Sequence, residues 1–466
     1  MDFKNKKIVV MGLGLYADGS GISATKYLLA QGANIVVTDL KTAEQLKSQL
    51  ERLGDLVNQV ELVLGQHRES DFLDADYIIR NPGVPKSSRF LQIAREHNIP
   101  IESDISLSFK LINKDRLLAV TGTRGKSTTT SLLYEIIKAN DKRAVLGGNI
   151  TKSPLAQMSA VKKGGPVVLE LSSFLLETLE PFKVSPHVAV FTNIYPDHLN
   201  AYNNIAEYVA AKENIWRWQE KDDFVILNRD NSITKAMGKR VVSQRLWFSL
   251  KSFTQENGVF VKKGKIVARL NGEEKNILAV KQLKMIGEHN VANACAATAA
   301  ALVYAVPLAV IKVVLKNFKG IADRLELLKE VRGVKYYNDT TSTTPEAGLV
   351  ALDAFKKYKK KIVMIAGGSD KGLNFSEIVK KMKSHCEALV LLNGTGTVRL
   401  LETIKQSKLR CPVLVVDSML EAVNQASGLV KKGGIVLLSP CCASFGMFSN
   451  EFDRGEKYRS AVKKIK

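Results

Sequence analysis

The sequence predicts an α/β protein of three consecutive domains. Short apolar runs typical of buried strands alternate along the whole chain with longer stretches typical of helices, which favours parallel sheets covered by helices on both faces. The length of 466 residues fits roughly three domains of about 150 residues each. We place the domains at residues 1–112, 113–320 and 321–466.

The first domain opens on a strand, a glycine-containing turn, a helix and a second strand. The first strand includes Ile8–Val10, Gly12 and Gly14 follow it, and the second strand ends at Asp39. This order is typical of Rossmann-like domains, which bind nucleotides at the first turn. The segment 74–85 (DADYIIRNPGVP) is expected to form another strand that ends in a rigid turn at the same sheet edge.

The other two domains repeat the alternation, and the last one is again Rossmann-like. Further strands are expected at residues 117–120, 167–169, 188–192, 224–227, 362–366, 388–392, 413–416 and 435–438. Residues 294–311 carry no charge, but the run is rich in alanine and contains Pro307. A buried helix is therefore expected there instead of a membrane span.

Composition limits the class of protein without identifying the partner. Five cysteines without a C-x-x-C pair indicate reduced thiols and a cytoplasmic protein, and the first residues lack the apolar run of a signal peptide. The formal net charge of +22 favours a polyanionic ligand. The sequence shows no recognisable motif for binding DNA or RNA.

The segment TGTRGKS (121–127) predicts a phosphate-binding loop. It follows an apolar strand and precedes a helix that runs to about residue 139, which is the order of a P-loop ATPase-like domain. Backbone N–H groups face the anion, Lys126 adds a positive charge, and the Ser127 hydroxyl can ligate Mg²⁺. The residues expected to hold the phosphates of ATP are Gly122, Thr123, Gly125, Lys126, Ser127 and Thr128.

Other polar residues of the central domain are ambiguous on their own. Glu170 ends an apolar strand and would suit a second metal ligand, or a solvated strand end. His198 lies in a polar turn after a strand, where a surface histidine is the alternative. Lys212 would by itself be a surface lysine. Asn290 and Asn293 share a helical face and suit either a nucleotide base or helix capping.

Five motifs taken together resemble the Mur ligases, a family of ATP-dependent amino-acid ligases in peptidoglycan precursor synthesis. They occur in the family's order over essentially the whole chain: TGTRGKST, ELSSF, NIYPDHL, AAK and HNVAN. The shortened phosphate loop is the family's own form. In the last domain, GGSDKGLNF and LSPCCASFGMFSNEFDRGEKY are similar to the member that adds D-glutamate to UDP-N-acetylmuramoyl-L-alanine.

The resemblance implies a reaction through an acyl phosphate and a catalytic set of Lys126, Glu170, His198 and Lys212. Ser127 and Glu170 would serve one Mg²⁺, and His198 and Lys212 a second. In this family the matching lysine is carbamylated, which turns a cation into a metal-binding carboxylate. A cytoplasmic, monomeric enzyme that neither binds nucleic acid nor inserts into a membrane is expected.

The resemblance also implies the substrate contacts. The residues matched to the UDP-substrate are Gly14, Leu15, Asp39, Asn81 and Asn149; those matched to ATP are Asn290, Asn293, Arg324 and Asp339; those matched to D-glutamate are Thr343, Lys371, Ser444 and Phe452. Core packing is the alternative for Phe452. Two features depart from the family: Thr341 stands where a lysine is usual, and the loop at 12–23 is longer than expected.

Three other functions remain open at this point. Gly12, Gly14 and Asp39 would also suit a nicotinamide oxidoreductase, although a lone glycine fingerprint is weak and leaves the Lys126 loop without a role. The positive charge would suit an ATPase stimulated by nucleic acid. A sibling ligase with a different amino-acid substrate is the most serious alternative.

Overall fold

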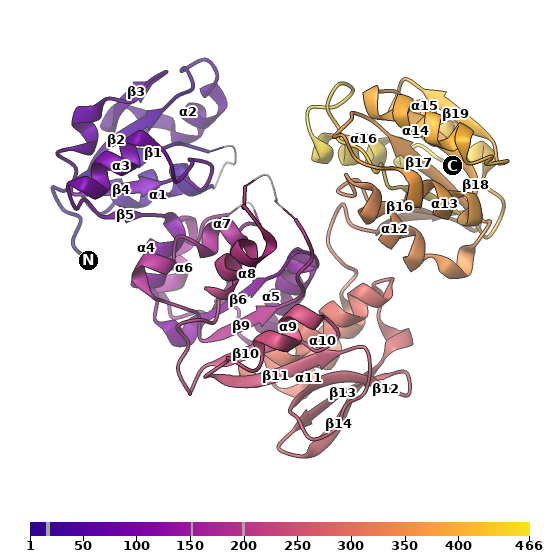
Figure 1. Ribbon diagram of the computed structural model, residues 1–466, viewed down its shortest axis with the longest axis horizontal. Coiled ribbons are helices and arrows are strands. Elements are labelled where there is room, and N and C mark those ends of the chain that lie inside the picture. The colour runs from indigo at the N-terminus through magenta and orange to yellow at the C-terminus, as the bar shows by residue number, and fades with distance from the viewer. Residues whose placement is uncertain (15–18, 151, 198–200) are drawn as a thin grey trace. The chain divides into compact units, whose positions relative to one another are not determined.

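The computed structural model describes residues 1–14, 19–150, 152–197 and 201–466 (Figure 1). They divide into two compact units: Met1–Gln282 with Ala292–Asn317, and Leu283–Val291 with Phe318–Lys466. The first unit contains two β-sheets and the second unit contains a third. The domain boundaries at 112/113 and 320/321 stay predictions.

The first sheet has five parallel strands in the order β3-β2-β1-β4-β5. Its strands are β1 (Lys7–Met11), β2 (Asn34–Asp39), β3 (Glu61–Leu64), β4 (Tyr77–Arg80) and β5 (Ile101–Glu102). The accompanying helices are α1 (Ser20–Leu29), α2 (Lys47–Leu53), α3 (Arg89–Glu96) and α4 (Asp104–Leu111). Ile8, Val9 and Val10 are fully buried, as a central parallel strand requires. The predicted strand–helix–strand start is confirmed.

The central sheet has nine strands in the order β14-β13-β12-β11-β10-β9-β6-β8-β7. Its strands are β6 (Leu117–Thr121), β7 (Val145–Gly148), β8 (Val167–Glu170), β9 (Val188–Phe191), β10 (Phe224–Asn228), β11 (Gln244–Ser249), β12 (Gly258–Lys262), β13 (Lys265–Leu270) and β14 (Glu273–Ala279). The helices are α5 (Lys126–Asn140), α6 (Met158–Lys162), α7 (Ser173–Leu176), α8 (Ile205–Glu213), α9 (Ser232–Met237), α10 (Glu288–Val303) and α11 (Leu308–Asn317).

The third sheet has six strands in the order β15-β16-β20-β17-β18-β19. Its strands are β15 (Glu326–Val331), β16 (Val334–Asn338), β17 (Ile362–Gly367), β18 (Cys386–Leu392), β19 (Val413–Val416) and β20 (Ile435–Leu438). The helices are α12 (Pro345–Ala354), α13 (Ser376–His385), α14 (Thr395–Gln406), α15 (Met419–Leu429) and α16 (Glu451–Lys463). Buried side chains of α12, α13 and α14 pack on one face, and those of α15 and α16 on the other.

Three expectations need correction. The sheets are not purely parallel, because β12, β13 and β14 pair antiparallel, as do β15 and β16. The sequence also predicts a helix over residues 205–218, but α8 ends at Glu213. The uncharged run 294–311 is not one helix: α10 and α11 are separated near Ala305, which has a φ of 56°.

The part of the uncharged run in α10 is buried, as expected, since Ala294 and Ala301 have no exposed surface, whereas Ala305, Pro307 and Ala309 after it are exposed. Among the described residues, no helix combines the length and the apolar character that crossing a bilayer requires. None of the five cysteines, all within the described part of the chain, forms a disulfide.

The parallel strands determine where ligands can bind. In a parallel sheet all carboxyl ends lie at one edge, and the loops that follow them form the binding surface. The predicted site residues Asp39, Glu170 and Asp339 stand at or directly after the ends of β2, β8 and β16.

Helix α16 depends on a side-chain cap at its amino end. Asn450 Oδ1 accepts hydrogen bonds of 2.9 Å from the backbone N–H groups of Phe452 and Asp453. We expect Asn450→Ala to lower the free energy of unfolding by about 1 kcal/mol, because two helix N–H groups lose their acceptor. Urea unfolding followed by circular dichroism measures the change. Asn450→Ser should recover most of the loss; equal destabilisation by both variants would contradict the capping role.

Candidate active site

The phosphate loop joins β6 to α5, as predicted, and its shape requires two glycines. Gly122 has a φ of 139° and Gly125 a φ of 82°, a region that side chains disfavour. A Cβ atom on Gly122 would lie 1.9 Å from the Thr192 hydroxyl oxygen. The loop therefore turns closely against the end of β9, and its N–H groups and the amino end of α5 form a cradle of the kind that binds phosphate.

Asn193 holds the tip of the loop and was missed by the sequence analysis. Its side-chain oxygen accepts a 2.9 Å hydrogen bond from Arg124 N, and its amide nitrogen donates to Arg124 O at 3.0 Å. Asn193 O also accepts from Thr123 N at 2.9 Å. The Arg124 side chain is exposed, with its guanidinium carbon 5.9 Å from the ring centre of Tyr195. Asn193 is the first residue of the NIYPDHL motif, but the motif by itself does not show that this side chain holds the loop.

Two lysine side chains share one backbone carbonyl as a hydrogen-bond acceptor. The Nζ atoms of Lys126 and Lys212 each lie 3.0 Å from Gly122 O. Lys212 is 1% exposed, so the alternative of a surface lysine is wrong. Burial, followed by the positive charge of Lys126, lowers the pKa of Lys212 well below that of an ordinary lysine. Compared with an exposed lysine, Lys212 is therefore present more often as the neutral, nucleophilic amine.

Tyr208 links Lys212 to the phosphate loop. Its hydroxyl lies 3.2 Å from Thr123 Oγ1, and Lys212 Nζ lies 4.9 Å from the centre of its ring. Burial raises the pKa of Tyr208 to about 12, so the hydroxyl stays protonated. The sequence predicts no role for Tyr208, although it precedes Lys212 by one helical turn on α8 and so shares its face.

Glu170 is a buried carboxylate with one oxygen left for a ligand. The residue is 2% exposed, so the alternative of a solvated strand end is wrong. Oε1 accepts a 2.9 Å hydrogen bond from Asn149 Nδ2, while Oε2 is buried and has no hydrogen-bond partner among the described residues. Leaving such an oxygen unpaired is costly, and a bound cation would remove that cost.

The oxygens of Glu170 and Ser127 fit a divalent cation that prefers oxygen ligands. Ser127 lies in the first turn of α5, directly after Lys126. Lys212 could contribute only as a modified, anionic side chain. His198, like Leu15, lies outside the described residues. Within the described ranges, no group of three or more His, Cys, Asp or Glu side chains is arranged to hold a metal.

Two further residues predicted to contact ATP lie at the phosphate loop. A Cβ atom on Gly125 would stand 2.5 Å from Asn293 Oδ1, so the amide of Asn293 lies directly against the loop. Thr128 is buried in the first turns of α5.

The first sheet brings three predicted substrate residues together. Asn81 lies against the turn after β1, since a Cβ atom on Gly14 would be 2.8 Å from its amide nitrogen. Asp39 accepts a 3.1 Å hydrogen bond from Leu13 N in the same turn. The ends of β1, β2 and β4 thus meet in one polar loop cluster, as predicted for a nucleotide-binding edge.

In the second unit, Asp339 connects two loops. Its carboxylate accepts hydrogen bonds from Leu325 N at 3.2 Å and Ser439 Oγ at 3.0 Å. Burial raises the pKa of Asp339 to about 7. Arg324, next to Leu325, is exposed at this edge. Asn290, also in the second unit, donates to Ile286 O at 2.8 Å.

Thr343, Lys371 and Ser444, predicted to bind D-glutamate, lie in the loops after β16, β17 and β20, and Phe452 lies in the first turn of α16. Lys371 Nζ donates to Thr343 Oγ1 at 3.2 Å. Ser444 is buried, and the loop that precedes it pairs with the Lys371 loop through two backbone hydrogen bonds. Phe452 is 45% exposed, so the alternative of core packing is wrong.

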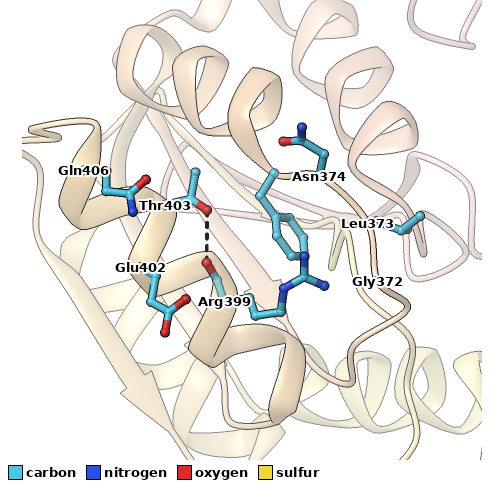
Figure 2. Close-up of a pocket in the computed structure, with 8 residues that line it drawn as sticks. Gly372, Leu373, Asn374, Arg399, Glu402, Thr403 and Gln406 are labelled. Atoms are coloured by element: carbon cyan, nitrogen blue, oxygen red, sulfur yellow. Dashed lines mark hydrogen bonds between the residues drawn. The ribbon is translucent and has the colours of Figure 1, made fainter.

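A cavity of about 260 Å³ begins next to Lys371 (Figure 2). Arg399 lines it from α14 and also pairs with both carboxylate oxygens of Asp370 at 2.8 Å, which fastens the Lys371 loop to α14. None of the predicted site residues lines this cavity. The cavity therefore lies beside the Lys371 loop and is not part of the candidate site.

Arg454 is a buried cation beneath the same loops. It has no exposed surface and donates to Thr340 O at 2.8 Å, Thr340 Oγ1 at 3.0 Å and Cys442 O at 3.2 Å. Burial lowers its pKa to about 10. Arg454 lies within the motif LSPCCASFGMFSNEFDRGEKY, but the sequence predicts no role for it. Among the described residues, the Thr341 hydroxyl donates a hydrogen bond to Asp323 O at 2.9 Å, a contact within the protein's own backbone framework.

Comparison with known families covers most of the chain. Residues 6–103 match the model described as Mur ligase MurD-like, N-terminal domain. Residues 120–301 match the Mur ligase middle domain, and residues 323–442 match the Mur ligase, glutamate ligase domain.

Individual relatives agree with these matches. The chain is 39% identical to a UDP-N-acetylmuramoylalanine–D-glutamate ligase from Roseiflexus sp., with 99% of each chain covered. It is 35% identical to the enzyme of the same name from Caldanaerobacter subterraneus, again with 99% of each covered. The solved structure of UDP-N-acetylmuramate-alanine ligase MurC from Thermotoga maritima shares the fold, with a TM-score of 0.61, 20% identity, and coverage of 99% of this chain and 100% of that one. The chain belongs to the Mur ligase family.

Proposed function

We propose that this protein is an ATP-dependent ligase that joins the L-alanyl carboxylate of UDP-N-acetylmuramoyl-L-alanine to the amino group of D-glutamate, in peptidoglycan precursor synthesis. The names of its full-length relatives support this reaction. The observation that carries it is the phosphate loop with Lys126, Lys212 and Glu170 around it.

The proposed chemistry overcomes the poor reactivity of a carboxylate. Its oxygen attacks the γ-phosphorus of ATP, the bond to ADP breaks, and an acyl phosphate forms. The amine of D-glutamate then attacks the carbonyl carbon, and phosphate leaves from the tetrahedral intermediate. The loop N–H groups, the amino end of α5 and the Lys126 ammonium hold the phosphates and stabilise their charge, while positioning brings the reactants together.

Mg²⁺ is proposed as the metal. Ser127 and Glu170 would hold one ion, and His198 with a carbamylated Lys212 would hold a second. The ions would offset the negative charge of the phosphoryl groups. The buried, neutral-prone amine of Lys212 supports the modification, since an amine must be deprotonated to react with carbon dioxide.

The remaining predicted residues are proposed as substrate contacts. Residues 1–112 would bind the UDP-substrate through Gly14, Leu15, Asp39 and Asn81. The central domain would bind ATP with Asn293, and residues 321–466 would bind D-glutamate. The further contacts proposed are Asn149 near the reacting phosphate, Asn290, Arg324 and Asp339 with ATP, and Thr343, Lys371, Ser444 and Phe452 with D-glutamate. A monomer working in the cytoplasm is proposed.

The alternatives fit the structure less well. A nicotinamide oxidoreductase would leave the Lys126 loop and the unpaired oxygen of Glu170 unexplained. A sibling ligase is opposed by the full-length relatives at 39% and 35% identity, both of which are named as D-glutamate ligases.

The first test is amino-acid choice. Separate reactions contain UDP-N-acetylmuramoyl-L-alanine, Mg²⁺-ATP and either D-glutamate, L-alanine, L-lysine or diaminopimelate. We expect phosphate release with D-glutamate alone, because only it supplies two carboxylates at the spacing for which Lys371 and Ser444 are proposed. Release with another amino acid and none with D-glutamate would show that the assignment is wrong.

The second test concerns Lys212. We expect Lys212→Ala to lower kcat by about 100-fold or more, because a group that stabilises the phosphoryl charge is lost. Acetate or propionate should restore part of the activity by replacing the missing carboxylate.

Lys142→Ala, an exposed change in the same domain, is the matched control and should keep full activity without responding to carboxylates. If no short carboxylate restores Lys212→Ala while the variant still binds ATP, the carbamate role is refuted.

A further inference from the structure

The second unit has a strongly basic surface that the proposed reaction does not use. Five of its strands (β16, β20, β17, β18 and β19) run parallel, so their amino ends lie at the edge opposite the candidate site. We define the basic edge as Arg332, Lys383 and the segments 356–361, 405–410 and 431–432. All of its lysine and arginine side chains are exposed.

Backbone hydrogen bonds show that the basic edge is continuous across the amino ends of β16, β20 and β17. Gly433 N donates to Gly333 O at 3.0 Å, which joins the turn before β20 to the turn before β16. Ile435 N donates to Lys361 O at 2.8 Å, which joins the same turn to the segment before β17.

The basic edge continues from β17 to the amino ends of β18 and β19. Lys360 Nζ donates to Lys383 O at 2.6 Å, at the end of α13. Lys383 Nζ donates to Ser407 O at 2.9 Å, within the segment 405–410 that follows α14. Neighbouring strands are about 4.8 Å apart, so five of them spread the charges over roughly 19 Å.

Most of this charge is not neutralised by the protein. Within the basic edge, Lys356 pairs with Glu288 at 2.8 Å and Lys431 pairs with Glu387 at 2.6 Å. Its other lysine and arginine side chains form no ion pair with any described residue. Lys383 and Lys405 lie at helix ends, where a cation is ordinary. The segments 356–361 and 431–432 need another explanation, because they lie outside the α-helices.

The side chains present favour a lipid surface over a nucleic acid. Apart from Arg332 and Arg410 the cations are lysines, which act as flexible point charges, whereas recognition of individual phosphates uses the arginine fork. Single-stranded nucleic acids are bound by aromatic rings on which bases stack. The one aromatic residue in these segments, Tyr358, is half-buried, and its ring packs edge-on against Phe355 with centroids 6.2 Å apart.

We propose that the basic edge binds reversibly to the surface of anionic lipid bilayers. Exposed lysine clusters are attracted to anionic headgroups without penetrating the membrane, and the attraction falls off within a Debye length of about 10 Å at 0.1 M salt. The carboxyl edge of the sheet points away from such a surface and stays accessible to small substrates. The proposal does not depend on the ligase assignment.

Co-sedimentation of the full chain with vesicles tests the proposal. Vesicles of phosphatidylcholine are compared with vesicles that also contain phosphatidylglycerol, at low and at physiological salt. We expect binding to be at least about tenfold stronger with phosphatidylglycerol and to weaken with salt.

Two charge-matched variants localise the effect. The edge variant carries Lys357→Gln, Lys359→Gln, Lys361→Gln and Lys432→Gln. The control variant neutralises four exposed lysines of the central domain, Lys263→Gln, Lys265→Gln, Lys275→Gln and Lys281→Gln. Circular dichroism verifies that both fold. Only the edge variant should lose vesicle binding.

Three outcomes would overturn the proposal. These are equal binding to both vesicle types, equal loss in both variants, and displacement of the protein from vesicles by a short RNA that binds it more tightly. Failure of these tests leaves the proposed ligase reaction untouched, since that reaction is measured with soluble substrates.

Discussion

The candidate active site depends on one backbone oxygen. Gly122 O accepts hydrogen bonds from Nζ of both Lys126 and Lys212, and so joins a residue of α5 to a residue of α8 at the end of β6. The positive charge of Lys126, which lies beside the amino end of α5, opposes a second positive charge on Lys212 and, together with burial, lowers the pKa of Lys212. An anion is therefore strongly favoured here, which is what a site for nucleotide phosphates requires.

The sequence predicted the parallel strands well because their signal is local. A strand buried on both faces, such as Leu117–Val120, is a continuous apolar run that is visible without knowing its neighbours. The antiparallel strand β14 was missed, since its residues EEKNILA are mostly exposed and resemble a polar loop. The early end of α8 was also missed, because the apolar residues Ile215 and Trp216 are buried without being helical.

In the candidate site too, the residues with a local sequence signal were predictable and the others were not. The glycine loop and Glu170 were predictable, since strand, turn and helix follow one another in the chain. Asn193, Tyr208 and Arg454 were not, because each acts on a partner at least 69 residues away or in another element. Their importance comes from tertiary contacts, and a single sequence does not reveal which polar residues make them.

The Asn193 side chain forms hydrogen bonds with both the backbone N–H and the backbone C=O of Arg124. The shape of the loop and the charge at its tip therefore depend on different residues. The shape of the loop is held by residue 193, whereas the charge at its tip is carried by the side chain of residue 124, which projects into solvent. Evolution or a protein engineer can thus vary the electrostatic character of the loop's rim without rebuilding the cradle. The side chain at position 124 can vary, whereas Asn193, like Gly122 and Gly125, is needed to keep the shape of the loop.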